Sequence, residues 1–100
     1  MSFIKCGLDV DAVFVENCLK AHHKLQDIVV IGVPDVELDN KVCGCVILKS
    51  TYADFTRGDA YPLYPSSLPP YQHLDLVYTF AKFPMGPDGL PDRDALREQR

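Results

Sequence analysis

The most constraining feature of this sequence is the run at residues 27–33, which reads Asp-Ile-Val-Val-Ile-Gly-Val. β-Branched residues favour extended backbone, and an unbroken apolar run is typical of a strand that is buried on both faces. Pro34 and Asp35 follow, and because a proline donates no hydrogen bond to a β-ladder, we expect the strand to end there. The fold must therefore cover both sides of this strand.

Three further extended segments are predicted. Residues 41–49 form a second strand, and the short connection to the first strand favours antiparallel pairing. Residues 74–83 alternate in a way that predicts a third strand. Near the N-terminus, a turn at Cys6 and Gly7 between two short extended pieces predicts a hairpin over residues 3–10.

Two helices are predicted to flank the strands. Asp11 is a good N-cap for a helix over residues 11–22. A short terminal helix over residues 92–99 carries charges that suit the helix dipole, with acidic residues at its start and basic residues at its end. These charged residues are Asp92, Asp94, Arg97 and Arg100.

Residues 50–70 are rich in proline, which removes a helical hydrogen bond and clashes with the preceding turn. We expect an irregular loop there, with a helical turn near Tyr52–Phe55. The fold class that these elements predict is α+β: a small, mainly antiparallel three-stranded sheet with flanking helices and a short N-terminal hairpin. Residues 1–100 are expected to form a single domain.

Composition excludes several classes of function. The chain has 10 basic and 14 acidic residues and a net charge of −4, so it offers no basic patch for a nucleic acid. No apolar run approaches the roughly 18–20 residues that a membrane helix needs. The first residues lack the apolar region of a secretory signal, and we expect an intracellular protein.

The cysteines do not predict a metal site. None belongs to a Cys-x-x-Cys pair, and neither His22 nor His23 lies at ligand spacing from a cysteine. Residues 43 and 45 of the second strand face the same way, and adjacent thiols of one strand rarely form a bridge. We therefore expect four thiols in a reducing compartment: Cys6, Cys18, Cys43 and Cys45.

Several short motifs then occur in a fixed order along nearly the whole chain. They are Phe3-Ile4-Lys5-x-Gly7, Val-Val-Ile-Gly-Val-Pro-Asp at 29–35, Leu68-x-Pro70-Tyr71, Pro84-x-Gly86-x-x-Gly89 and Leu96-Arg97-Glu98. In this order and spacing, they resemble the C-terminal subdomain of the adenylate-forming superfamily, which includes acyl-CoA synthetases, nonribosomal adenylation domains and beetle luciferases.

The resemblance implies a lid that works with a much larger N-terminal domain, in cis or in trans. Members of the family activate a carboxylate with ATP and then transfer the acyl group to a thiol, while the lid turns about a hinge, here just before Phe3. The acyl pocket belongs to the large domain. No cofactor is therefore expected on this chain alone, and ATP with Mg²⁺ and CoA are implied only for the parent enzyme. The resemblance implies a cytoplasmic location, and a peroxisomal one also occurs in the family.

One departure concerns the chemistry directly. The family places a catalytic lysine after the glycine of its last loop, and that position is Leu90 here. Lys82 and Arg93 are the nearest cations in the sequence, and neither occupies that position. Lys5 is retained beside the hinge, as a candidate for the thioester-forming step or as a solvated lysine at a turn. By the same resemblance, Gly7 and Gly89 are the candidate cofactor-binding positions.

Three functional hypotheses follow. The chain is the lid part of a larger ligase-like protein, predicted to be inactive alone. Alternatively, it is a degenerate lid that serves as a binding or regulatory module of a pseudo-ligase, which Leu90 favours. The third hypothesis, an unrelated small enzyme, has little support, because the sequence shows no nucleophile triad, paired-carboxylate pocket or phosphate-binding loop.

Overall fold

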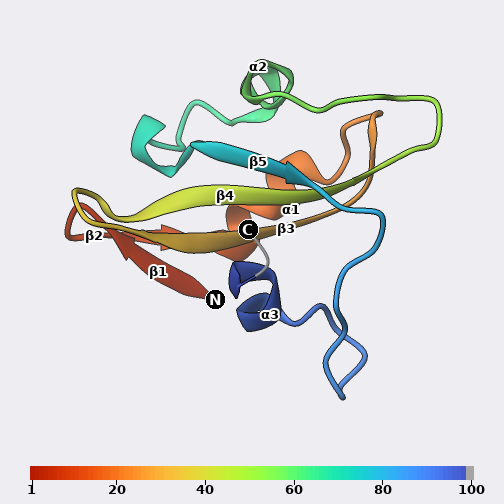
Figure 1. Cartoon of the computed structure of the whole chain (residues 1–100). Coiled ribbons are helices and arrows are strands. Elements are labelled where there is room, and N and C mark those ends of the chain that lie inside the picture. Colours follow the sequence, from red (N-terminus) through yellow and green to blue (C-terminus); the bar gives the residue numbers. More distant parts are fainter. Residues whose placement is uncertain (99–100) are drawn as a thin grey trace.

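The structure is a computed structural model of the chain, and it describes residues 1–98. It contains five strands, three α-helices and two short 3₁₀ turns within this range (Figure 1). The elements, in chain order, are β1 (Ser2–Lys5), β2 (Leu8–Asp11), α1 (Ala12–Leu19), β3 (Leu25–Asp35), β4 (Asp39–Leu48), α2 (Arg57–Ala60), η1 (Tyr61–Leu63), η2 (Pro70–Gln72), β5 (Leu76–Thr79) and α3 (Arg93–Glu98).

The β-branched run forms the middle of β3, and every residue from Ile28 to Val33 is buried, as predicted. The strand does not end before Pro34, however, because Pro34 still pairs with Asn40 of β4. The N–H of Val30 points away from β4, and residues two apart in a strand point the same way. The nitrogen of Pro34 therefore lies on the free edge of β3, where a missing N–H costs no ladder hydrogen bond.

The sheet has the strand order β3-β4-β5 and is mixed rather than mainly antiparallel. β3 and β4 pair antiparallel as predicted, but β5 runs parallel to β4, with Cys45 opposite Tyr78. A parallel neighbour needs a crossover of a dozen or more residues, and the proline-rich segment between β4 and β5 is that crossover. This segment lies along the β5 edge of the sheet (Figure 1).

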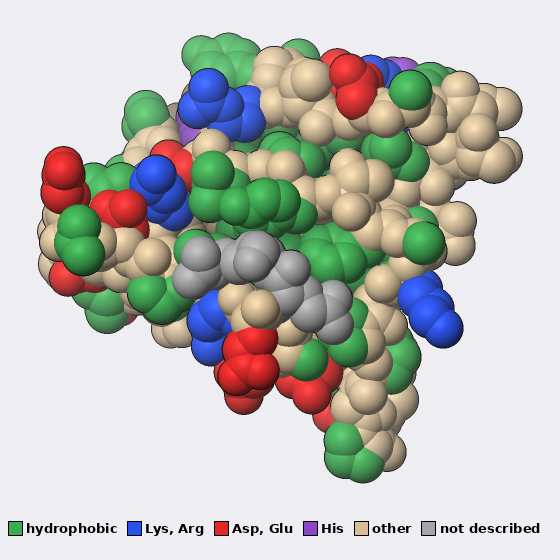
Figure 2. Space-filling model, in the orientation of Figure 1, with side chains coloured by type: hydrophobic (Ala, Val, Ile, Leu, Met, Phe, Trp, Pro, Cys, Tyr) green, Lys and Arg blue, Asp and Glu red, His purple; other side chains and the backbone are tan. Residues whose placement is uncertain are grey.

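Each face of the sheet has its own apolar layer. On one face, α1 packs Val15 and Leu19 against β3 and β4, and the crossover adds Phe55 and Leu68. The opposite face carries Val29, Ile31, Val33, Cys43, Cys45, Phe83 and Leu96 of α3. Figure 2 shows hydrophobic side chains gathered over this second face. The prediction that residues 43 and 45 face the same way is therefore confirmed, and no disulfide links cysteines within residues 1–98.

The hairpin and the first helix are both present as predicted, but their lengths differ from the predicted ones. β1 and β2 form the expected antiparallel hairpin. The carboxylate of Asp11 accepts a hydrogen bond from the N–H of Phe14, so it caps α1 as predicted. The helix ends at Leu19 rather than at residue 22, and His22 instead forms a turn in which its Nδ1 accepts from the N–H of Lys24.

The helical turn expected near Tyr52–Phe55 is found later in the crossover. Thr56 and Asp59 form a capping box, each side chain accepting from the backbone N–H of the other residue, and this box begins α2. Hydrogen bonds from the Thr56 N–H and from Lys24 lower the pKa of the Asp59 carboxyl. The expected position of the turn was therefore wrong, whereas no long helix crosses the span, as the prolines predicted; Pro62 lies at the start of η1, where its missing N–H costs nothing.

The third strand and the terminal helix both begin later than predicted. The third strand covers Leu76–Thr79 rather than residues 74–83, although the N–H of Phe80 still donates to the carbonyl of Val46. The terminal helix begins at Arg93, and the predicted positions Gln99 and Arg100 lie outside the described residues.

An ion pair joins α1 and α3 at the free edge of β3. The guanidinium of Arg93 contacts both carboxylate oxygens of Glu16, at 2.9 and 3.2 Å. Glu16 also accepts from the N–H of Val30 at 3.0 Å, and Arg93 donates to the carbonyl of Val30 at 2.7 Å. Both backbone groups of this edge residue are thereby paired.

We predict that Arg93→Ala lowers the free energy of unfolding by about 2–4 kcal/mol, because it leaves the Glu16 carboxylate buried without its counter-charge. Urea denaturation of the two proteins measures this difference. Arg57→Ala is the matched control, because Arg57 is exposed, and it should change stability by less than about 0.5 kcal/mol. Equal effects of the two substitutions would contradict the prediction.

Candidate functional site

The loop that carries Leu90 is a narrow turn between Phe83 and α3. The backbone closes it through a bridge between Met85 and Pro91 and through the N–H of Gly86, which donates to the carbonyl of Leu90 at 2.7 Å. Gly89 has a φ of +80°, the left-handed conformation that favours glycine. Leu90 itself is 62% exposed, so its side chain projects from the loop into solvent.

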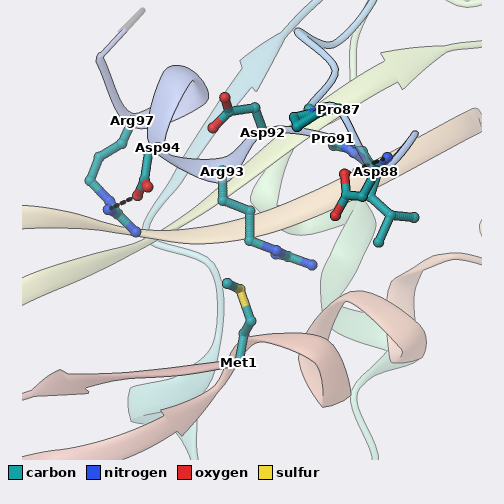
Figure 3. A pocket seen from close by; sticks show the side chains of 10 residues that line it. Met1, Pro87, Asp88, Pro91, Asp92, Arg93, Asp94 and Arg97 are labelled. Atoms are coloured by element: carbon teal, nitrogen blue, oxygen red, sulfur yellow. Dashed lines mark hydrogen bonds and ion pairs between the residues drawn. The ribbon is translucent and has the colours of Figure 1, made fainter.

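The cavity beside Leu90 is lined by both acidic and basic side chains. The loop and the start of α3 line an open cavity of about 520 Å³, which includes Met1 and three aspartates, Asp88, Asp92 and Asp94 (Figure 3). The carboxylate of Asp88 accepts from the N–H of Leu90 at 3.1 Å. The loop at residues 84–91 therefore carries no cation, and it presents an exposed apolar side chain beside a carboxylate.

The cavity also contains two arginines, and both are held by other groups. Arg93 is paired with Glu16 and Val30, as described above. Arg97 donates to the carbonyl of Gly32 at 2.8 Å and to the carboxylate of Asp94 at 2.9 Å (Figure 3). Neither guanidinium is therefore free to pair with an anion beside Leu90 in this arrangement.

The charge of Arg93 also acts on the interior of the sheet. A hydrogen bond with Cys43 lowers the pKa of the buried Cys45 thiol against the effect of burial, and the positive charge of Arg93 lowers it further. Arg93 thus acts electrostatically on β4 as well as on Glu16. Lys82, the other cation named from the sequence, is exposed and precedes the loop.

Lys5 is not solvated, contrary to one of the two expectations for it, since only 6% of the residue is exposed. Its Nζ donates to the carboxylate of Asp75 at 2.8 Å and to the carbonyl of Tyr71 at 2.8 Å. The same Asp75 oxygen accepts from the N–H of Val42 at 2.8 Å. Lys5 therefore ties the hairpin to the beginning of β5 and to β4.

The hairpin turn is also tied to the rest of the chain. Cys6 and Gly7 both have positive φ angles, 53° and 76°. The N–H of Cys6 donates to the carbonyl of Leu38, and the N–H of Gly7 donates to the carboxylate of Asp39. Both backbone donors of the turn are thus paired within the chain, which leaves Gly7 a structural role in this arrangement.

The structure separates the predicted site residues into two groups. Lys5 and Gly7 belong to the hairpin, and Gly89 and Leu90 belong to the loop before α3. Figure 1 shows the hairpin turn and this loop at opposite ends of the molecule. No local pattern indicates the partners Glu16 and Asp75, because they lie 77 and 70 residues from Arg93 and Lys5.

Two other classes of site receive no support from the described residues. Within residues 1–98, no group of three or more His, Cys, Asp or Glu side chains is placed to hold a metal ion. Among the helices of the same residues, none is long and apolar enough to cross a membrane.

Comparison with known proteins identifies the fold. No protein-family model and no curated protein matches the sequence. The structure of MbtA from Mycobacterium smegmatis matches all of this chain with a TM-score of 0.89 at 18% identity. The amide bond synthetase McbA from Marinactinospora thermotolerans matches 98% of it with a TM-score of 0.84 at 26% identity. A fatty acyl CoA synthetase from Mycobacterium tuberculosis matches 98% with a TM-score of 0.83 at 20% identity.

These matches confirm the resemblance drawn from the motifs. The chain has the fold of the C-terminal lid subdomain of adenylate-forming enzymes. It spans only about a fifth of the length of each of these three structures, which is 20% of McbA and 19% of the other two.

We predict that Asp75→Ala lowers the free energy of unfolding by about 2–4 kcal/mol, because Lys5 and the N–H of Val42 both lose their buried acceptor. Asp54→Ala is the matched control: its carboxylate pairs with Lys24 but is 70% exposed, so its loss should cost less than about 1 kcal/mol. Thermal and urea unfolding compare the two variants. A loss of the same size in both would show that Lys5 is not held by Asp75.

Proposed function

We propose that this chain acts as the lid of an adenylate-forming protein, together with a large N-terminal domain in cis or in trans. The observation that carries the proposal is the fold match, which covers at least 98% of this chain and about a fifth of enzymes that include an acyl-CoA synthetase and an amide bond synthetase. The large domain would supply the acyl pocket. The lid alone is then expected to be inactive.

ATP use is supported for the family by a structure of ATP-bound MatB from Rhodopseudomonas palustris, which matches with a TM-score of 0.84 at 20% identity. The loop of this chain does not fit a phosphate group. Leu90 provides neither charge nor donor, and both nearby arginines are paired with carboxylates. We therefore assign no step of an ATP-dependent reaction to this loop.

The same observation supports the second candidate function, a degenerate lid that binds or regulates within a pseudo-ligase. A cation aimed at developing phosphate charge contributes several kcal/mol in a water-poor site, and this loop lacks one. Lys5 remains the candidate for the thioester-forming step. To act through its ammonium, it would have to leave Asp75 and Tyr71, which now hold it.

We predict that the isolated chain neither adenylates carboxylates nor forms thioesters, because the large domain is absent and Leu90 supplies no charge. Release of pyrophosphate from ATP is measured with a panel of fatty and aromatic acids. Turnover well above a buffer blank would contradict the prediction.

We further predict that Leu90→Lys restores adenylation when residues 1–100 are fused to the large domain of a working relative. The unmodified fusion should adenylate roughly a hundredfold more slowly than the Leu90→Lys fusion, because the missing cation stabilises charge in the transition state. Thioester formation from a synthetic acyl-adenylate should change less than about twofold between the two fusions, since that step does not form the same phosphate charge.

Leu90→Met is the matched control, because it keeps an apolar side chain of similar size and should not restore adenylation. Pro91 stiffens the loop and limits how far the new lysine can adjust, so a partial rescue is compatible with the proposal. Fast adenylation by the unmodified fusion would show that another residue performs the work of the lysine. That result would overturn the role assigned to Leu90.

A further inference from the structure

The crossover between β4 and β5 carries an aromatic cluster that the lid function does not use. The rings of Tyr64 and His73 stack with their centroids 3.9 Å apart. Tyr61 meets both rings edge-on, at 6.5 and 5.9 Å. Tyr61 is 69% exposed, while the other two residues are half-buried. We call these three residues the aromatic ridge.

The ridge is fixed in place by the backbone around it. The hydroxyl of Tyr64 accepts from the N–H of Leu74 at 2.9 Å, which joins the ridge to the residues just before β5. The capping box at Thr56 and Asp59 fixes the turn of α2, which leads directly into Tyr61. A pre-formed aromatic surface loses little conformational entropy when it binds a partner.

Two shallow hollows lie against the ridge, and all three ring residues line both of them. The first, of about 310 Å³, is completed by Arg57, Gly58 and Leu74. The second, of about 230 Å³, is completed by prolines, Ser66 and Leu68. Both hollows are open to solvent. Small-molecule sites enclose most of their ligand, so two open hollows that share a ridge suit an extended chain better than a compact ligand.

The polar groups at these hollows define the chemistry of that chain. Arg57 is exposed at the first hollow and forms no ion pair with the described residues. The Nε2 of His73 is buried and has no hydrogen-bond partner within residues 1–98. Aromatic grooves with free donors bind polyproline II segments, whose proline rings pack on aromatic faces and whose backbone carbonyls are not used internally.

We propose that the aromatic ridge and its two hollows bind a proline-rich segment in the polyproline II conformation, with an acidic side chain at the end that meets Arg57. Successive prolines pack on the two sides of the ridge, and the hydroxyl of the exposed Tyr61 donates to a peptide carbonyl. The acidic side chain follows from charge complementarity, because Arg57 is the cation that lines the first hollow. This inference does not depend on adenylation or on Leu90.

The test uses the 100-residue chain and a fluorescein-labelled peptide, Ala-Pro-Pro-Ala-Pro-Pro-Glu-Glu, in a fluorescence anisotropy titration. We expect saturable binding below about 1 mM, the range of weak peptide complexes. Tyr61→Ala should weaken binding at least about tenfold, as loss of an aromatic anchor does. Tyr52→Ala is the matched control, because Tyr52 is also partly exposed but lies outside both hollows, and it should leave binding unchanged.

A charge reversal tests the role of Arg57 separately. Arg57→Glu should abolish binding of the Glu-Glu peptide and permit binding of a matched Ala-Pro-Pro-Ala-Pro-Pro-Lys-Lys peptide. In the unmodified chain, NMR should show shifts of the ring protons of Tyr61, Tyr64 and His73 when the first peptide is added, so one measurement requires no variant.

Three results would overturn the proposal. The first is a lack of saturable binding by the unmodified chain. The second is equal binding of a peptide in which glycine and serine replace the prolines while both glutamates remain. The third is displacement of the peptide by inorganic phosphate, which would show that the first hollow takes a small anion rather than a peptide.

Discussion

The ion pair between Glu16 and Arg93 holds the two layers of this protein together. Glu16 lies on α1, behind one face of the sheet, and Arg93 begins α3, on the other face. They meet at the free edge of β3, where they pair both backbone groups of Val30 as a neighbouring strand would. A buried pair stabilises a fold only when its remaining hydrogen-bonding positions are also filled, and here Val30 fills them.

This pairing also decides what the neighbouring loop can do. Arg93 follows Leu90 by three residues and is the cation nearest to that position in the sequence. Because its guanidinium must remain with the buried Glu16 carboxylate, moving it to Leu90 would leave an unpaired charge in the interior. The stability of the fold thus keeps this guanidinium away from Leu90. Lys5 is under a similar constraint, since Asp75 depends on it as a counter-charge.

Local sequence signals predicted a large part of the fold. The β-branched run at 27–33, the turn at Gly7 and the N-cap at Asp11 each depend on near neighbours and were found as elements of the predicted type. The parallel direction of β5 was not predictable in this way, because alternation along a strand is the same in both directions. It depends on the course of the crossover. Within the crossover, a prediction based on the prolines missed the capping box at Thr56 and Asp59 that begins α2.

The site could be predicted only in part, and for a similar reason. The position of Leu90 came from the order of motifs, whereas the burial of Lys5 depends on residues far away in the sequence. No periodicity relates Lys5 to Asp75 or Glu16 to Arg93. Ion pairs that join distant elements have no local sequence pattern. The charged residues could therefore be named from the sequence, but their partners could not.

Leu90 is exposed on its loop, whereas the proline-rich crossover places Phe55 and Leu68 in one apolar layer and leaves most of its other residues exposed. A change on an exposed loop costs little stability, so the fold is retained while the chemistry of the loop changes. The crossover must still be long enough to bring β5 parallel to β4, and a rigid proline-rich chain achieves this at low entropic cost. The aromatic ridge follows from this solution, because prolines prevent a long helix there and leave Tyr61, Tyr64 and His73 stacked at the surface.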